Sequence, residues 1–198
     1  VEQIGTGREY RLGPTVLRLA ALREAQVPTR EAAMPVLQAL AQKTGETAHL
    51  SMLMGGALHT LGYAYSPAHM TRVTMEDAET LPFHATSSGL AVLAFQPDAF
   101  RDAFLSQPIP RLTGRTETNP DALRARLAEV RSLGLSESRG AFQAEVHSMA
   151  VPLFDALGRC MGAVAVAALA MRMTEPQRRL IRFALTEAGS EITTLWGG

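Results

Sequence analysis

The stretch TAHLSMLMGGALHTLGYAY, residues 47–65, decides the fold class. Apolar side chains recur at every second position before the Gly55-Gly56 pair and return after it, which is the period of a β-strand rather than of a helix. Two consecutive glycines between such runs favour a two-residue turn. The stretch therefore predicts an antiparallel hairpin, in which a turn at the two glycines pairs His59 with Met52 and His49 with Gly62.

Two helices and a short strand are expected before this hairpin. Residues 8–12 favour a strand after a glycine-rich turn, and Pro14 stands where the first turn of a helix tolerates proline. Thr29 is a suitable N-cap for a second helix, which Gly45 ends. The change from a helical to a strand period at residue 47 thus marks the start of the sheet.

The segment after the hairpin predicts one more strand and three helices. Residues 70–75 favour the strand, and residues 90–95 and 97–105 favour two short helices. Asn119 precedes a third, strongly periodic helix that stops at Gly134.

The C-terminal part of the chain completes the predicted sheet. Residues 146–154 and 161–169 are apolar at most positions, as buried central strands are. Thr174 caps a final helix that runs to about Trp196. Helices before, between and after mostly antiparallel strands predict an α+β fold, the arrangement of small sensor domains.

The composition is that of an ordinary globular domain. The 198 residues are 46% hydrophobic and 19% charged, and 19 basic residues balance 19 acidic ones. Zero net charge gives no general attraction to nucleic acid or to a membrane surface, and no apolar run is long enough to span a bilayer. The single cysteine, Cys160, excludes an internal disulfide, so we expect a reduced, cytoplasmic setting. Because the chain starts at Val1 within a strand-like phrase, we expect an N-terminal part to precede it.

Catalytic and metal-binding patterns are scarce. The sequence holds no Gly-x-Ser-x-Gly elbow, no His-Glu-x-x-His, no phosphate loop and no dinucleotide fingerprint. His49, His59 and His69 are evenly spaced, but the expected pairing keeps the first two apart, which favours satisfied or exposed histidines over a metal site. Cys160 has no acid or histidine beside it and is expected to be structural. We therefore expect neither an enzyme nor a bound cofactor.

The stretch LPFHATSSGLAVLAF, residues 81–95, is the candidate binding feature. Thr86 or Ser87 can cap the helix that starts there, and the first amides of a helix lack intrahelical partners and lie at the positive end of its dipole. Small residues beside the cap would let an anion approach the backbone: Ala85, Ser88 and Gly89. The alternative is a plain helix cap with the space filled by side chains, and the residues alone leave both open.

Several segments, in order along nearly the whole chain, resemble those of one family. They are Tyr10-Arg11-Leu12-Gly13, Thr44-Gly45-Glu46-Thr47, Leu81-Pro82-Phe83-His84-Ala85-Thr86, Thr113 with Thr116, and the stretch from Met149 to Gly158. Each segment is weak alone, but their order and spacing are specific. The chain resembles the effector-binding region of the isocitrate lyase regulator (IclR) family of bacterial transcription factors.

The resemblance implies a GAF- or profilin-like antiparallel sheet flanked by helices. It divides the chain into residues 1–12, the end of the wing of a winged helix-turn-helix; residues 13–26, a linker helix; and residues 27–198, the effector-binding domain. The implied function is to sense a small organic acid or an aromatic catabolite and to shift a homodimer or homotetramer between DNA-binding states. Operator DNA would be bound only through the N-terminal headpiece, of which this chain holds the tail.

The effector site that the resemblance implies lies between the sheet and the loop before the hydroxyl run, and it adds Ser138 and Ser148. Ala165 and Ala167 stand where the family often has serine. The floor would then be apolar, so a larger, partly apolar or aromatic acid would fit better than a small oxo-acid whose oxygens stay unpaired. Met52 could add an adaptable wall, although methionines at strand spacing are more often plain core.

Two other classes of protein stay open at this stage. A stand-alone GAF-like sensor would have no DNA-binding headpiece. An enzyme would need a nucleophile and a base brought together from distant parts of the sequence.

Overall fold

The computed structural model describes residues 2–4, 9–11, 15–16, 29–76 and 79–197. Two short strands, β1 (Glu2–Ile4) and β2 (Glu9–Arg11), pair antiparallel, and β2 covers the centre of the strand predicted at residues 8–12. The predicted linker helix lies outside the described residues, apart from residues 15–16.

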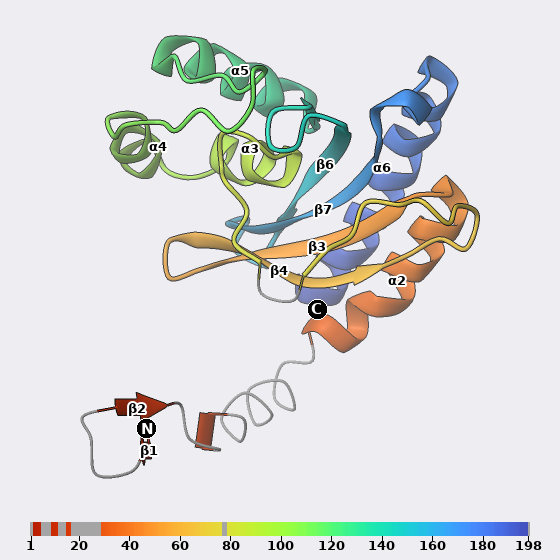
Figure 1. Ribbon diagram of the computed structural model, residues 1–198, viewed down its shortest axis with the longest axis horizontal. Helices are drawn as coiled ribbons and strands as arrows, with labels where there is room; N and C mark the ends of the chain where they lie inside the picture. The colour runs from red at the N-terminus through yellow and green to blue at the C-terminus, as the bar shows by residue number, and fades with distance from the viewer. Residues whose placement is uncertain (1, 5–8, 12–14, 17–28, 77–78, 198) are drawn as a thin grey trace.

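Five strands form one antiparallel sheet in the order β4-β3-β7-β6-β5 (Figure 1). They are β3 (Thr47–Met54), β4 (Ala57–Ala64), β5 (Ser136–Arg139), β6 (Val146–Phe154) and β7 (Cys160–Leu169). The late strand β7 lies at the centre, between the hairpin and β6. The predicted α+β class, with a helix-flanked antiparallel sheet, is confirmed.

The β3–β4 hairpin turns at the two glycines, as predicted. Gly55 and Gly56 have φ angles of 59° and 83°, which glycine adopts without the steric cost that a Cβ atom adds. Met54 and Ala57, on either side of the turn, are the first paired residues. The turn thus fixes the register of the adjoining pairs.

Further from the turn, the pairing of the hairpin differs from the prediction. Met52 faces His59 as expected. A β-bulge in the middle of the hairpin then inserts an extra residue on β4, so His49 faces Tyr63 rather than Gly62. Alternation of apolar residues on one strand cannot reveal an extra residue on its partner, so the prediction missed the shift.

Helices cover both faces of this sheet (Figure 1). On one face lie α2 (Thr29–Thr44) and the long α6 (Glu175–Gly197), which follows a short 3-10 helix, η1 (Ala170–Arg172). On the other face lies α3 (Ser87–Ala94), with α4 (Asp98–Leu105) and α5 (Pro120–Leu133) packed outside it. Each helix buries its apolar side against the sheet or against a helix that does.

The helix boundaries follow the predicted capping residues closely. The side chain of Asn119 accepts hydrogen bonds from the amides of Asp121 and Ala122, and Gly134 ends α5 with a φ angle of 65°. The hydroxyl of Thr174 accepts the amide of Gln177 at the start of α6. Predicted caps therefore locate these ends to within a residue or two, and α2 is described from Thr29 onward.

Two segments differ from the predicted elements. Residues 70–75 are irregular rather than a strand, and Thr80 alone in that region forms an isolated bridge, with His59, among the described residues. β5 was not predicted, because its sequence SESR carries no apolar alternation. It is a short edge strand, and its inward side chains are the hydroxyl groups of Ser136 and Ser138.

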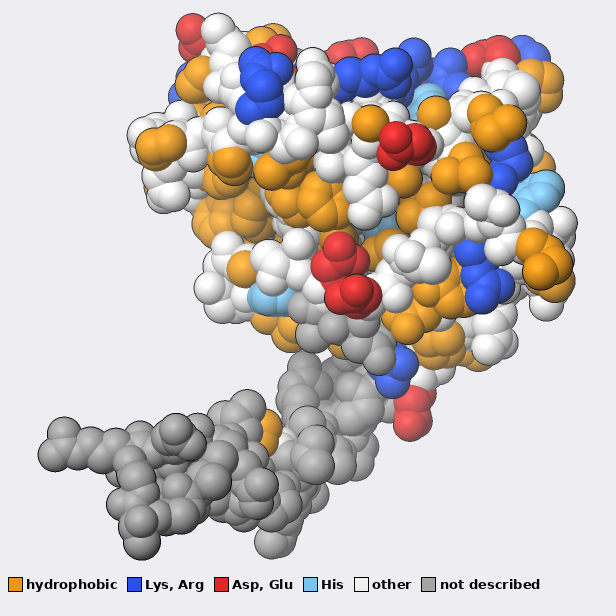
Figure 2. Space-filling view, in the orientation of Figure 1, with side chains coloured by type: hydrophobic (Ala, Val, Ile, Leu, Met, Phe, Trp, Pro, Cys, Tyr) orange, Lys and Arg blue, Asp and Glu red, His pale blue; other side chains and the backbone are white. Residues whose placement is uncertain are grey.

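Charged side chains gather on the outside of α4 and α5, along one edge of the face in Figure 2, where apolar side chains occupy more of the middle. Arg124 of α5 forms ion pairs with Asp102 of α4, at 2.8 Å, and with Asp121, at 3.6 Å. Exposed pairs of this kind contribute little to stability. The apolar contacts beneath them hold the two helices in place.

Candidate functional site

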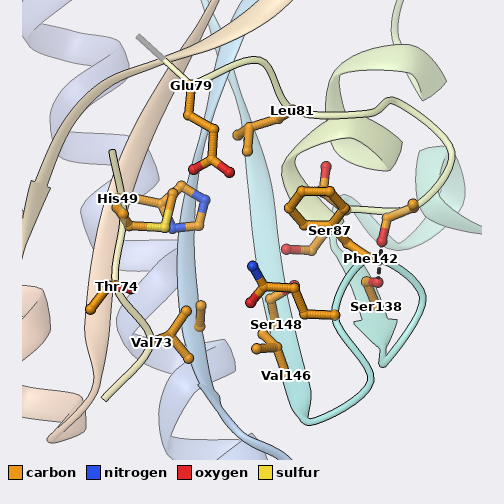
Figure 3. A pocket seen from close by; sticks show the side chains of 15 residues that line it. His49, Val73, Thr74, Glu79, Leu81, Ser87, Ser138, Phe142, Val146 and Ser148 are labelled. Atoms are coloured by element: carbon orange, nitrogen blue, oxygen red, sulfur yellow. Dashed lines mark hydrogen bonds between the residues drawn. The ribbon is translucent and has the colours of Figure 1, made fainter. Parts of the chain in front are cut away.

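A cavity of about 50 Å³ lies between the sheet, the start of α3 and the loop that joins β5 to β6 (Figure 3). Side chains of the irregular segment before α3 close it on another side. A space of this size admits only a few water molecules. A larger ligand can enter only if side chains of the wall move.

The start of α3 forms one end of this cavity. Thr86 is the N-cap: its hydroxyl accepts the amide of Gly89 at 2.9 Å and donates to the carbonyl of Pro82 at 2.9 Å. Ser87 is the first helical residue, so the sequence-based choice between Thr86 and Ser87 as cap is settled for Thr86. The positive end of the helix dipole therefore faces the cavity.

Two serines of β5 hold the start of α3 against the sheet. The hydroxyl of Ser138 donates to the carbonyl of Ala85, and the hydroxyl of Ser136 donates to the carbonyl of Ser87, both at 2.6 Å. Each serine has thereby used its one hydrogen. Ser138 also lines the cavity, where it can only accept a hydrogen bond from a ligand.

The loop between β5 and β6 is fixed at its beginning. The hydroxyls of Thr113 and Thr116 donate to the carbonyls of Gly140 and Ala141, each at 2.6 Å. Phe142, which follows directly, lines the cavity. The far end of the loop is held as well, because the amide of Ala170 donates to the carbonyl of Glu145 at 2.7 Å.

Two polar atoms in the cavity wall are buried without a hydrogen-bond partner among the described residues. They are Oγ of Ser87 and Nδ1 of His49. Ser87 is 1% exposed and His49 is 5% exposed, so bulk water does not satisfy them. A buried polar group without a partner costs roughly 1–3 kcal/mol. A molecule in the cavity with complementary polar atoms would remove that cost.

Burial shifts the pKa of both titratable groups of the wall toward the neutral form. Burial lowers the pKa of His49 to about 4, which keeps its imidazole neutral at neutral pH. Burial also raises the pKa of Glu79, the charge of Glu76 adds to this, and a backbone hydrogen bond opposes it. The described residues of the wall include no lysine or arginine.

An ionic network lies on the other face of β5. Burial opposes ionisation of Glu137, but hydrogen bonds from His147, Arg178 and Arg139 outweigh it and hold the pKa of this carboxyl well below its usual range. Arg178 of α6 binds it through two nitrogens, at 2.7 and 2.9 Å. A bidentate ion pair between Glu137 and Arg178 thus links the edge strand β5 to α6.

The structure brings six of the residues predicted for the site into the cavity wall. They are Ala85, Thr86, Ser87, Ser138, Ser148 and Ala167. These residues come from the loop before α3 and the first residue of that helix, from β5, from β6 and from β7. Their contact with a ligand stays a prediction.

Four predicted residues lie outside the wall, each for its own reason. Ser88 turns to His49, with 3.1 Å between Oγ and Nε2. A Cβ atom on Gly89 would come within 2.5 Å of the Phe83 backbone, so this glycine serves close packing of α3 rather than approach of an anion. Ala165 belongs to the core under α3.

Met52 is on the wrong face of the sheet for the predicted role. Even-numbered residues of β3 share one face of the sheet, and Ala48 and Leu50 on that face pack with α2 and α6. The cavity lies on the opposite face, toward α3. The alternation of side chains along β3 therefore excludes it from the wall.

Sequence reasoning missed nine residues of the wall. They are His49, Val73, Thr74, Met75, Glu79, Leu81, Phe142, Gln143 and Val146. His49 could have been found, since it is polar and faces away from the apolar side of a central strand. The others come mainly from irregular segments, for which the sequence carries no periodic signal.

The remaining chemical possibilities are limited in the part of the chain that the structure describes. No helix there is apolar over a length that would cross a membrane. No group of three or more histidine, cysteine or acidic side chains is placed there to hold a metal ion. Cys160 begins β7, and burial raises the pKa of its thiol to about 11, so little reactive thiolate exists at neutral pH.

A family profile described as "Bacterial transcriptional regulator IclR C-terminal" matches residues 21–194. The chain belongs to the IclR family. The resemblance read from the sequence is thereby confirmed, and the matched part is the effector-binding domain of a transcriptional regulator.

Relatives within the IclR family are regulators. The probable transcriptional regulator SauR of Cupriavidus necator is 32% identical over 178 residues, which are 89% of this chain and 70% of that protein. The Pca regulon regulatory protein of Pseudomonas putida is 26% identical over 194 residues, 96% of this chain and 67% of that protein. This chain therefore spans about two thirds of the length of these relatives.

Solved structures of IclR proteins have the same fold. A crystal structure of an IclR-type regulator from Silicibacter sp. TM1040 has a TM-score of 0.94 and 52% identity, covering 100% of this chain and 78% of that one. An IclR homologue from Microbacterium hydrocarbonoxydans, in complex with 4-hydroxybenzoate, has a TM-score of 0.79 and 28% identity, covering 93% and 76%.

Proposed function

We propose that this domain senses a small organic acid in the cavity at the start of α3, and that the bound effector changes how the whole regulator binds DNA. The observation that carries the proposal is the pair of unsatisfied buried atoms, Oγ of Ser87 and Nδ1 of His49, in a cavity that also receives a helix N-terminus. Buried polar groups are normally satisfied, so each exception requires an explanation, and a bound molecule is one. Two further unpartnered atoms among the described residues, Oγ1 of Thr60 and Nε1 of Trp196, lie outside the cavity wall.

The walls support a partly apolar or aromatic acid over a small oxo-acid. Leu81, Phe142, Val146 and Ala167 are among the apolar residues that line the cavity. A small, highly polar acid would leave oxygen atoms against these side chains, at roughly 1–3 kcal/mol for each unpaired group. The relative that binds 4-hydroxybenzoate has the same fold, which supports this class of effector.

The effector would act by a shift of population. A ligand changes an equilibrium only by binding one arrangement of the protein more tightly than another. Because the cavity is small, we infer that the ligand selects a state in which Phe142 and its loop have moved outward. The linker helix at residues 13–26 would carry the change to a DNA-binding headpiece in a cytoplasmic homodimer or homotetramer.

A ligand panel tests this proposal by thermal shift. We expect aromatic and branched acids to raise the melting temperature more than glyoxylate or pyruvate do, because only the former fill the apolar walls. The variant Ala167→Leu should abolish the shift, because its added carbons occupy the cavity. The matched control is Ala103→Leu, at an exposed position of α4.

Two results would contradict the proposal. One is the reverse ranking of the acids. The other is an unchanged ligand response in Ala167→Leu, since binding would then take place elsewhere on the domain.

A further inference from the structure

The hydrogen bond between Ser88 and His49 determines which nitrogen of the imidazole carries the proton. Oγ of Ser88 lies 3.1 Å from Nε2 of His49, and the described residues offer this hydroxyl no other acceptor. A buried hydroxyl donates its hydrogen where it can, so Nε2 is the acceptor. A neutral imidazole then has its hydrogen on Nδ1.

The Nδ1–H group is therefore a donor that points at no protein acceptor. It is buried, it belongs to the cavity wall, and it has no partner among the described residues. Oγ of Ser87, in the same wall, is unpartnered as well. Together they offer hydrogen bonds to oxygen atoms of a ligand without adding a positive charge.

Glu79, in the same cavity wall, offers a hydrogen-bond acceptor where His49 and Ser87 offer donors. Figure 3 shows its carboxyl group and the His49 ring directed into the space across from Ser87. An ionised carboxylate only accepts hydrogen bonds and repels another anion. In its ionised form Glu79 therefore favours a ligand whose approaching part carries a hydroxyl or an amino group.

We propose that the effector is an acid with a second, hydrogen-donating group: Ser87 donates to its carboxylate at one side of the cavity, and at the opposite side Glu79 accepts from its hydroxyl or amino group while His49 donates to the oxygen of that hydroxyl. This inference rests on the function proposed above. It makes Glu79 a specificity-determining residue and Ser88 a positioning residue that acts through His49. Phe142 and Val146 would cover the apolar body between the two polar ends.

Calorimetric titration of the chain with benzoate, the three hydroxybenzoate isomers and 4-aminobenzoate tests the role of Glu79. We expect at least one hydroxylated or aminated acid to bind about tenfold more tightly than benzoate, because it gains a hydrogen bond to a charged acceptor. In Glu79→Leu this advantage should disappear, while benzoate binds no more weakly. The matched control is Glu191→Leu, since Glu191 is exposed on α6 and lies outside the cavity wall.

The outcomes separate this inference from the function on which it rests. If none of the acids binds, the proposed function is contradicted and this inference with it. If they bind, Ala167→Leu abolishes binding and Glu79→Leu keeps the same preference among them, only the role of Glu79 is contradicted.

Nitrogen-15 NMR of the imidazole tests the role of Ser88 without any ligand. We expect the proton on Nδ1 of His49 in the unaltered chain and a mixture of the two tautomers in Ser88→Ala. Ser88→Ala should also weaken binding of the preferred acid several-fold, whereas Ser106→Ala, at an exposed position, should change neither result. A proton on Nε2 in the unaltered chain would overturn the assignment of His49 as a donor.

Discussion

The two faces of the central sheet are built from side chains of different size. Toward α2 and α6, β7 presents Val164 and Val166, and these pack with leucines and isoleucines into a filled core. Toward α3, the same strand presents Ala163, Ala165 and Ala167, and the cavity lies above the last of them. One alternating stretch of sequence therefore encodes a packed core on one side and room for a ligand on the other.

The faces also differ in polarity. The side toward α3 buries imidazole and hydroxyl groups, among them His49, Ser51, Ser88 and Ser138. Each such group needs a partner, so this face is held together by directional bonds as well as by contact. Both faces contain buried apolar clusters, but ligand binding should depend on the face toward α3, where the cavity lies.

The largest expected effect is on the packed face. Leu185→Ala removes a fully buried side chain of α6, and we expect the free energy of unfolding to fall by about 2–5 kcal/mol. Urea denaturation followed by circular dichroism measures this. Leu195→Ala, on the same helix but 48% exposed, is the control and should cost less than about 1 kcal/mol. Equal losses in the two variants would show that burial of Leu185 against the sheet does not stabilise the domain.

A second prediction concerns the pH dependence of the polar face. His49 has a pKa of about 4 in the folded chain against 6.5 for the unperturbed group, so between these values the unfolded chain binds more protons. The free energy of unfolding should therefore fall by up to about 3 kcal/mol as the pH drops from 6.5 to 4, and the fall should be smaller in His49→Gln.

The same pH series has an internal control. His84, whose pKa burial also lowers, and Glu79, in the same cavity, titrate in both proteins. The difference between the two curves thus reports mainly His49, together with any change that its loss causes at Glu79. Parallel curves would show that this imidazole is not held neutral by burial.

The smallest expected effect compares two neighbours on opposite faces. Ala168→Leu overfills the packed core and should cost about 1–3 kcal/mol. Ala167→Leu projects into the cavity and should cost less than about 1 kcal/mol, even though the unaltered residue is only 3% exposed. Chemical denaturation of both variants provides the comparison, and a larger loss for Ala167→Leu would argue against a cavity at this place.

The sequence predicted most of the regular elements, because their signals are local. The glycine pair at Gly55 and Gly56, the cap at Asn119 and the stop at Gly134 act through their own backbone and nearest neighbours. The strand at Ser136–Arg139 escaped prediction because an edge strand of polar residues has no apolar period. The bulge in the hairpin escaped it because it depends on both strands together.

The site was predictable only in part, for a related reason. Thr86 and Ser87 stand out because helix capping is local, and the resemblance supplied Ser138, Ser148 and Ala167. Glu79 lies in a segment without regular structure, and only the tertiary fold brings it to the cavity. Ser88 was predicted as a ligand contact, but its hydroxyl is taken by an imidazole from another strand.

The short edge strand β5 reaches the helices on both sides of the sheet. Ser136 and Ser138 donate hydrogen bonds to the start of α3. Glu137, between them, forms an ion pair with Arg178 of α6. If the start of α3 moves outward, either the hydrogen bonds from Ser136 and Ser138 lengthen or β5 moves with it. A displaced β5 in turn displaces α6 through the ion pair of Glu137 with Arg178. The four residues of β5 thus connect the helices on the two sides of the sheet. Through them, ligand binding in the cavity can change the position of α6 without rearranging the packed core.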